Sequence, residues 1–427
     1  MKYNALQTDK FLWGVATSAF QIEGQIQNDM TEWESLGKFK NNGYDPNYEK
    51  ASLHWQNWEK DFDLLKTLQV NSYRFSLEWA RIQPDMNQFN QRAINQYQKM
   101  VDRLLELNIT PMLTLHHFSH PSWFHHRTPW HQESSIEIFY EYTRKIIDIF
   151  HDRINLYISF NEPLVWLLAA YAEAKFPPGE KNLDLLITAL TNMLQCHQKV
   201  YDLIKSKNKN AEVGIAKNLI VFSAQRGWNL FDRGIVLLIH NFFNRALLEA
   251  FRNNKLKLSF PFLLNFETDL QLSDKLDFWG INYYYRMHLK YKFNRQRPID
   301  MNFANRSGEG LSDMGWEIYS EGLWKVIQLV HQTGKPFYIT ENGIADANDI
   351  LRLAYLKNHL RIIQRAREKE LPLKGYYYWS LLDNYEWLVG KQAKFGLFEV
   401  DFNESYQRRL RDSGSFYADY ILNQTDQ

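Results

Sequence analysis

Eight short apolar runs alternate with segments of helical spacing along this chain, and this alternation constrains the fold more than any other feature. The runs lie at about residues 11–20, 72–79, 109–116, 154–160, 213–220, 277–284, 336–340 and 375–380. Between most of them apolar residues recur with a helical period, as Trp58, Phe62 and Leu65 do at i, i+4 and i+7. Strands that alternate with helices predict a parallel sheet, and eight such strands predict a closed (β/α)8 barrel.

The competing architecture is an open, doubly wound sheet. Such a sheet would carry a glycine-rich phosphate turn after an early strand, and the sequence has none. The connections at about 21–55, 220–276, 285–320 and 384–411 are too long for simple turns, and long loops in compact domains are usually functional. We therefore predict an α/β protein, a single (β/α)8 TIM barrel with extended βα loops that spans residues 1–427 as one domain.

Composition excludes several classes of partner and compartment. The 50 Lys+Arg residues balance 49 Asp+Glu residues, so a basic nucleic-acid binder is not expected. No run of about 18 uninterrupted apolar residues is present, and we expect no membrane partner. The start of the chain lacks the pattern of a signal peptide, and the single cysteine, Cys196, fits a reducing compartment. These features predict a cytoplasmic protein.

Polar or aromatic residues follow nearly every predicted strand. In a parallel barrel the carboxyl ends of the strands meet at one rim, where functional groups lie. A structural barrel would not need so many of them at one rim. The groups lie on the runs or just after their ends: Gln21 and Glu23 at the first run, Arg74 at the second, His116 and His117 at the third, Asn161 and Glu162 at the fourth, Asn282 and Tyr284 at the sixth, Glu341 and Asn342 at the seventh and Trp379 at the eighth.

Two carboxylates at this rim, Glu162 and Glu341, follow apolar strands directly. A charge there is costly unless it is used or paired. Paired carboxylates that flank an uncharged ring are the equipment of glycoside hydrolysis. The alternative is that each glutamate only caps the helix that follows. Both stand beside an asparagine, in Asn-Glu-Pro and Glu-Asn-Gly, and this pairing favours chemistry over capping.

Six histidines between residues 116 and 131 raise the alternative of a metal site. Adjacent residues on a strand point to opposite faces, so His116 and His117 cannot readily share one ion. No HExxH motif or cysteine partner accompanies them. We expect no metal, and we expect several of the histidines to be solvated loop residues.

Seven motifs, in this order, resemble those of the family 1 glycoside hydrolases, the β-glucosidase and β-galactosidase group. They are FLWGVATSAFQIEG, YRFSLEWARI, TLHHF, FNEP, GINYY, ITENG and WSLLDNYEW. The resemblance runs from residue 11 to about residue 402. It implies a (β/α)8 barrel, retention of anomeric configuration and no cofactor.

The resemblance assigns the two carboxylates separate roles. Glu162 in FNEP matches the general acid/base and Glu341 in ITENG matches the nucleophile. Arg74, Asn282 and Tyr284 match the groups that support the nucleophile. A retaining mechanism then implies that the two carboxyl groups lie about 5–5.5 Å apart.

Seven further residues match sugar-binding positions of the family. Gln21, His117 and Asn161 match residues that hold hydroxyls of the sugar at the cleavage point, and Glu386 and Trp387 match the pair that binds O4 and O6. Trp379 matches the platform under the sugar ring, and Phe395 matches a further wall of the site.

We therefore expect the protein to be a retaining exo-β-glycosidase. Its main expected activity is that of a β-glucosidase, and β-galactosidase and β-fucosidase activities are left open. Its partner would be a small-molecule β-glycoside or oligosaccharide. Relatives that cleave 6-phosphoglycosides resemble one another in carrying serine where this chain has Glu386, so unphosphorylated substrates are expected. A mainly transglycosylating relative and a non-catalytic carbohydrate-binding barrel are the alternatives. The natural aglycone, its linkage and the oligomeric state are left open.

Overall fold

The computed structural model describes residues 10–39, 48, 50–260, 264–294, 298–403 and 405–425. Eight parallel strands in these residues close a barrel, with β1 paired to both β2 and β13. Each predicted strand range overlaps one barrel strand, so the predicted (β/α)8 fold is confirmed. The strands are β1 (Leu12–Ala16), β2 (Ser72–Ser76), β3 (Thr110–His116), β4 (Leu156–Asn161), β5 (Glu212–Asn218), β9 (Phe278–Asn282), β12 (Phe337–Asn342) and β13 (Leu373–Trp379).

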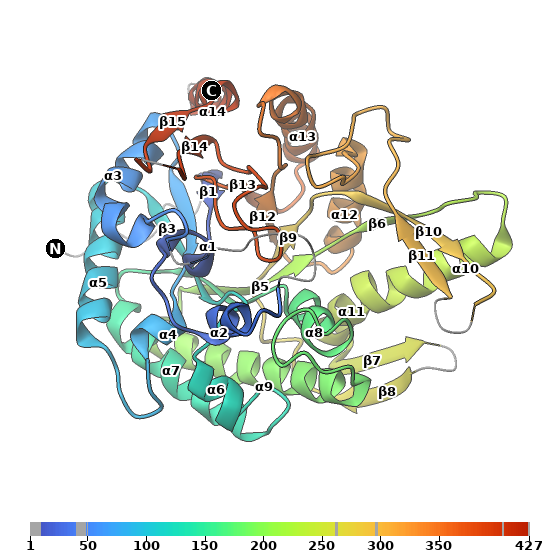
Figure 1. Ribbon diagram of the computed structural model, residues 1–427, viewed down its shortest axis with the longest axis horizontal. Coiled ribbons are helices and arrows are strands. Elements are labelled where there is room, and N and C mark those ends of the chain that lie inside the picture. The colour runs from blue at the N-terminus through green and yellow to red at the C-terminus, as the bar shows by residue number, and fades with distance from the viewer. Residues whose placement is uncertain are drawn as a thin grey trace.

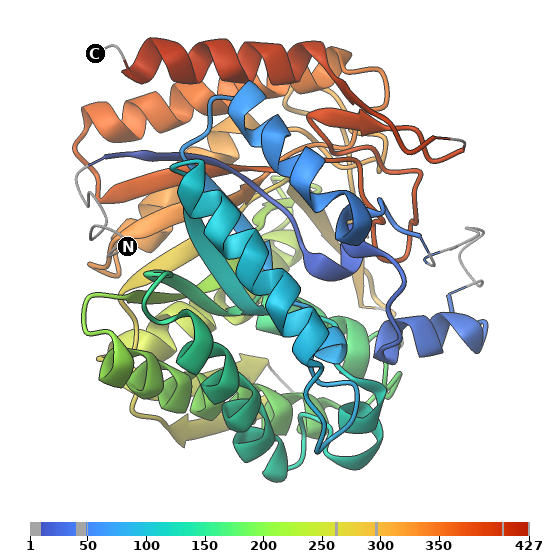
Figure 2. The same cartoon turned by 90° about the vertical axis from the view of Figure 1, so that its left-hand side faces the viewer.

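Helices surround the strands on the outside (Figure 1), and Figure 2 shows α14 lying beside α13. Asn90 and Asn182 begin α5 and α9 by accepting hydrogen bonds from backbone N–H groups of the first turn. The helices are α1 (Ala19–Glu23), α2 (Asp29–Ser35), α3 (His54–Thr67), α4 (Trp79–Ile82), α5 (Gln91–Glu106), α6 (Ser122–Arg127), α7 (Ser134–Phe150), α8 (Pro163–Tyr171), α9 (Leu183–Lys207), α10 (Leu230–Ile239), the π-helical η2 (His240–Arg245), α11 (Ala246–Asn253), α12 (Ser320–His331), α13 (Ile350–Glu368) and α14 (Asp412–Thr425).

Side chains alternate between two cores along each barrel strand, as the pleat requires. On β13, Tyr376 and Tyr378 belong to the large core between strands and helices, whereas Tyr377 and Trp379 belong to the smaller core inside the barrel. On β2, Tyr73 and Phe75 face outward in the same way. The aromatic residues of these strands are therefore divided between the barrel lumen and the surrounding helices.

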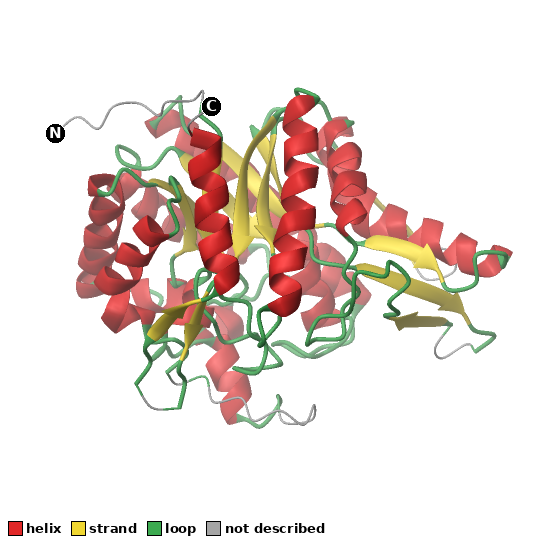
Figure 3. Ribbon diagram, turned by 90° about the horizontal axis from the view of Figure 1, so that it is seen from above, coloured by secondary structure: helices red, strands yellow, loops and turns green. Residues whose placement is uncertain are grey.

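Two of the long connections build an arm at one side of the barrel. Strands β6 (Val221–Ala224), β10 (Arg286–Tyr291) and β11 (Ile299–Asn302) form a small sheet beside α10. Figure 3 shows this sheet and α10 projecting from the barrel. The remaining strands form two hairpin-like pairs, β7 (Lys255–Phe260) with β8 (Leu264–Asp269) and β14 (Phe398–Val400) with β15 (Arg408–Leu410).

The first strand ends earlier than the sequence predicts. β1 stops at Ala16, and Gln21 and Glu23 lie in α1, which the Ser76 hydroxyl helps to start by accepting from the Ala19 N–H. Gln21 turns toward the barrel mouth, whereas Glu23 accepts hydrogen bonds from Arg81 and Tyr97 behind it. The rim position of Gln21 is thus reached from a helix.

Candidate active site

A cavity of about 570 Å³ opens at the carboxyl ends of the barrel strands. Ten of the twelve residues predicted from the sequence line it, and Arg74 and Asn282 lie against them through hydrogen bonds. Segments from the whole length of the chain therefore meet in this cavity. The ten are Gln21, His117, Asn161, Glu162, Tyr284, Glu341, Trp379, Glu386, Trp387 and Phe395.

Glu162 is placed by a sharp turn between β4 and α8. Its backbone is left-handed, at φ 45° and ψ 52°, and Pro163 begins the helix directly after it. The Glu162 N–H donates to the Ala216 carbonyl at 2.8 Å, which fixes the turn against β5. This geometry directs the Glu162 side chain into the cavity, where Asn282 Nδ2 and Asn218 Nδ2 donate to its Oε1 at 2.7 and 3.1 Å.

Both carboxylate oxygens of Glu341, on β12, accept short hydrogen bonds. Arg74 Nη1 donates to Oε1 and the Tyr284 hydroxyl donates to Oε2, each at 2.6 Å. Gly343 lets this strand end approach β13, because a Cβ there would stand 1.8 Å from the Trp379 carbonyl oxygen. A buried guanidinium and a phenol therefore fix the orientation of the Glu341 carboxyl group.

A chain of polar groups joins the two carboxylates below the cavity. Arg74 Nη2 and Asn282 Nδ2 both donate to Asn161 Oδ1, at 2.6 and 3.0 Å. Asn161 Nδ2 lies 3.1 Å from His117 Nε2, so that nitrogen accepts and the ring proton sits on Nδ1. Burial, with the nearby Arg74 cation, holds the pKa of His117 well below its ordinary value. His117 Nδ1 has no partner among the described residues, which leaves a neutral donor for a ligand hydroxyl.

The surroundings of Glu162 favour its protonated form. Burial raises the pKa of Glu162 to about 8, and the charge of Glu341 adds to this rise against the hydrogen bonds from Asn282 and Asn218. Glu162 is therefore a protonated acid at neutral pH, facing a carboxylate that accepts two strong hydrogen bonds. One group can donate a proton while the other attacks.

The far end of the cavity combines an amide, a carboxyl group and flat rings. Gln21 Nε2 donates to Glu386 Oε2 at 2.9 Å. Burial and the charge of Glu341 raise the pKa of Glu386 to about 8. The His117 ring lies nearly parallel to Trp379 and Trp387, with centroids 5.8 and 6.1 Å apart. Such an end suits a hydroxylated ring.

Sequence reasoning missed several residues of the cavity. Asn218 donates to Glu162, and it ends β5, the one predicted strand for which no rim residue was named. Asn218 could have been found in the same way as the other rim residues, because functional groups lie at the carboxyl ends of barrel strands. A largely apolar wall was also missed. Its members are Val165, Leu168, Ala169, Ala172, Phe176, Ile220, Phe222, Ile239, Phe242, Phe243, Met287 and Met301.

The histidine cluster is partly buried. His116 points out of the barrel against Trp130 and Phe160, on the face opposite to His117. His120 is also buried, and its ring lies 3.4 Å from Asp29. His116 and His120 are therefore not among the solvated histidines, since aromatic packing and an acid cover them, whereas His126 is exposed and His125 and His131 are partly exposed.

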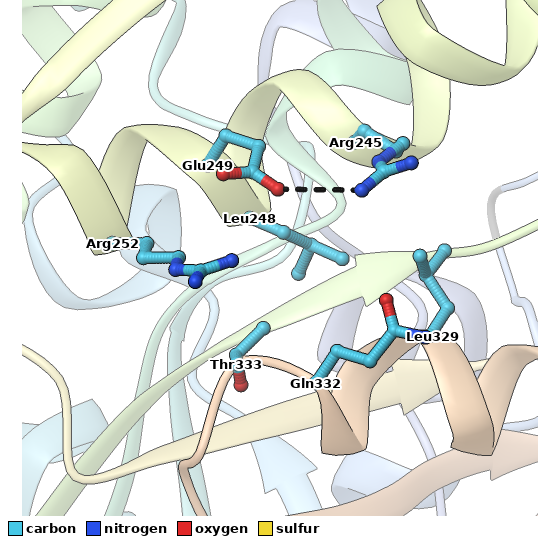
Figure 4. Close-up of a pocket in the computed structure, with 7 residues that line it drawn as sticks. All are labelled: Arg245, Leu248, Glu249, Arg252, Leu329, Gln332 and Thr333. Carbon is cyan, nitrogen blue, oxygen red and sulfur yellow. Dashed lines mark ion pairs between the residues drawn. The ribbon is translucent and has the colours of Figure 1, made fainter.

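A second depression lies on the outside, between α11 and α12 (Figure 4). Its volume of about 10 Å³ has room for about one water molecule. Arg245 and Glu249 form an ion pair across one side of it at 3.6 Å. A depression so small is no candidate for the substrate site.

Comparisons with known proteins agree with this geometry. The family model described as Glycosyl hydrolase family 1 matches residues 3–426. Beta-glucosidase A of Thermotoga maritima is 32% identical over 443 residues, 97% of each chain. The solved structure of a beta-glycosidase from Pyrococcus horikoshii has a TM-score of 0.88 at 33% identity, and covers 98% of this chain and 95% of that one. The Thermotoga maritima beta-glucosidase with deoxynojirimycin has a TM-score of 0.85 at 28% identity, over 98% of both chains. The chain belongs to glycosyl hydrolase family 1 and is a glycoside hydrolase.

Proposed function

We propose that this enzyme is a retaining exo-β-glycosidase with unphosphorylated β-glucosides as its main substrates. The observation that carries the proposal is the pair of buried glutamates in the cavity, one hydrogen-bonded by two amides and the other by a guanidinium and a phenol. The name of the Thermotoga maritima relative, a beta-glucosidase, supports glucose at the cleavage point. β-Galactosides and β-fucosides are further substrates to be compared with it.

The first chemical step forms a covalent glycosyl-enzyme. A Glu341 carboxylate oxygen attacks C1 of the sugar, and the bond from C1 to the aglycone oxygen breaks with its electron pair on that oxygen. The leaving oxygen takes the proton of Glu162. Arg74 and Tyr284 keep the attacking carboxylate in one orientation through their hydrogen bonds to it.

The second step returns both glutamates to their starting states. Once Glu341 is an ester, its charge no longer raises the pKa of Glu162, although burial still does. Glu162 then accepts a proton from water, the water oxygen bonds to C1, and Glu341 leaves as a carboxylate. Two displacements at C1 retain the β configuration.

The amide, the carboxyl group and the flat rings at the far end of the cavity support cleavage of a neutral sugar. Lys391, a conceivable phosphate ligand, lies over the Phe402 ring, 5.3 Å from its centroid, and is not among the residues that line the cavity. An ionised Glu386 carboxylate would repel the phosphate of a 6-phosphoglycoside. Because the pKa of Glu386 is about 8, that repulsion develops only as the pH rises through about 8.

The test is hydrolysis of a panel of aryl β-glycosides by the wild-type protein and by Glu341→Gln. We expect β-glucoside to have the highest kcat/KM and the variant to be inactive. Product analysis with an added acceptor sugar distinguishes hydrolysis from transglycosylation, since only the latter yields new glycosides. Absence of β-glycoside cleavage by the wild type would reject the proposal.

We also propose a cytoplasmic location. Cys196, the single cysteine, is a buried free thiol, which fits a reducing compartment. Fractionation of cells that express the native gene tests this, and recovery of the protein outside the cell would contradict it.

A further inference from the structure

The arm beside the active site carries an unusually apolar outer surface. We define the apolar arm as residues 221–239 together with the described residues of 286–302. Six large apolar side chains on it are between 55% and 86% exposed. Figure 3 shows α10 and its sheet standing clear of the barrel, so little else of the fold is near to cover them. The six are Trp228, Leu230, Phe231, Leu237, Phe293 and Met301.

Helix α10 is apolar on nearly all sides but is not a core helix. Asp232 and Arg233 are its only charged residues, and Asp232 is the only residue of α10 that is fully buried. A helix that is apolar all round is normally enclosed by protein or lipid. Protein alone does not enclose this one.

The helical segment Leu230–Asn253 is long and apolar enough to cross a membrane by length and composition alone, and 39% of its most apolar window is buried. Its second half packs into the core, where Leu247, Leu248 and Phe251 are buried. Crossing a bilayer would expose that core. The first half can instead lie on a lipid surface without any change of fold.

The apolar arm is continuous with the active-site cavity. Its inner residues Phe222, Ile239, Met287 and Met301 form part of the apolar wall of the cavity. Met301 is also one of the six exposed side chains, so the wall reaches the outer surface without a polar break at that point. An apolar chain attached to a sugar at Glu162 would find this wall beside it.

Charge favours an anionic lipid surface over a second copy of the chain. Arg226, Arg233, Lys290 and Lys292 lie on the arm, and two of them pair with Asp232 and Asp300. Arg233 and Lys290 have no carboxylate within 4.0 Å in the part of the chain that the structure describes. A symmetric contact between two arms would bring these cations together, whereas anionic head groups would attract them.

We propose that the apolar arm docks on an anionic lipid surface and that the enzyme takes from it β-glycosides with a long apolar aglycone. The substrate part rests on the proposed glycosidase function, but the docking does not. The earlier expectation of no membrane partner considered only uninterrupted apolar runs, and charged residues such as Asp232 and Arg233 interrupt this segment. The proposal replaces that expectation.

The docking test is flotation of the full-length protein with phosphatidylcholine vesicles, with and without phosphatidylserine. The double variant Leu230→Glu/Leu237→Glu places two charges on the exposed face. The control, Ile350→Glu, changes an equally exposed apolar residue at the start of α13. Wild type and control should float with the anionic vesicles, and the double variant should bind about tenfold or more weakly, because apolar contacts are lost.

The substrate test compares dodecyl β-glucoside held in the same vesicles with a water-soluble aryl β-glucoside. The double variant should keep the aryl rate and lose most of the rate on the vesicle-held substrate. Equal vesicle binding by wild type and double variant would overturn the proposal, and so would an arm-dependent dimer in light scattering. If the wild type floats but cleaves neither glucoside, the glycosidase function fails while the docking stands.

Discussion

Replacing Asn218 by leucine tests how the protein sets the proton on its acid. Asn218 Nδ2 donates to Glu162 Oε1 at 3.1 Å, and the 2.7 Å hydrogen bond from Asn282 stays in place. Both amides favour the carboxylate form and so oppose the burial that raises the pKa of Glu162 to about 8. Without Asn218 this pKa should therefore rise further.

The size of the change follows from the lost contact. A hydrogen bond to a charged group contributes about 1.5–3 kcal/mol, and one pKa unit corresponds to about 1.4 kcal/mol. The longer of the two bonds is the one removed, so we expect a rise of about one unit. Cleavage needs the proton on Glu162, so kcat/KM persists below its pKa and is lost above it. The alkaline limb of the plot of kcat/KM against pH should therefore move from about pH 8 in the wild type to about pH 9 in Asn218→Leu.

The assay is kcat/KM against pH on a β-glucoside with a poor leaving group, which depends on acid catalysis. Asn192→Leu is the control, because Asn192 is a buried asparagine of α9 that donates to the Trp130 carbonyl at 2.8 Å, away from the cavity. The control should keep the wild-type limb. An unchanged limb in Asn218→Leu, or one moved to lower pH, would refute the reasoning.

Further predictions concern four carboxyl groups, those of Glu341, Glu162, Glu386 and Glu317. Glu341→Gly should lose activity on every glycoside and regain part of it with small anions such as azide; no rescue would argue against a nucleophile there. Glu162→Ala should slow poor leaving groups far more than activated aryl ones, and equal losses would mean that the roles are misassigned. The preference for glucoside over 6-phosphoglucoside should grow as the pH rises through about 8, where Glu386 ionises, and a flat ratio would contradict this. Burial alone would raise the pKa of Glu317, but hydrogen bonds, led by those from Arg286, lower this pKa to about 2. The ionised Glu317 should therefore stabilise the folded protein fully above about pH 4.5, and this stabilisation should be lost as the pH falls toward 2. Glu317→Gln should reduce stability in urea unfolding by about 3 kcal/mol at pH 7, and no change would contradict a structural ion pair.

The barrel and its rim could be predicted because the barrel strands are buried on both faces. Such strands appear in the sequence as near-continuous apolar runs, and a polar residue at the end of a run stands out. Glu162 after β4 and Glu341 on β12 were found in this way. The sugar-binding roles came instead from the family resemblance, and Glu386, Trp387 and Phe395 were found only through it, since nothing local in the sequence marks them.

What could not be predicted depends on contacts between distant segments. Gln21 reaches the cavity from α1, because β1 ends at Ala16 before the apolar run does. The elevated pKa of Glu386 arises from burial and from the charge of Glu341, 45 positions away in the chain. The apolar arm joins two connections that are separated by β9, so neither one reveals the shared surface.

The most direct test of the account is proton NMR of the sugar first released from an aryl β-glucoside. A covalent intermediate on Glu341, opened by water that Glu162 activates, predicts that β-glucose appears first and only then mutarotates. Release of α-glucose as the first product would contradict the proposed roles of both glutamates.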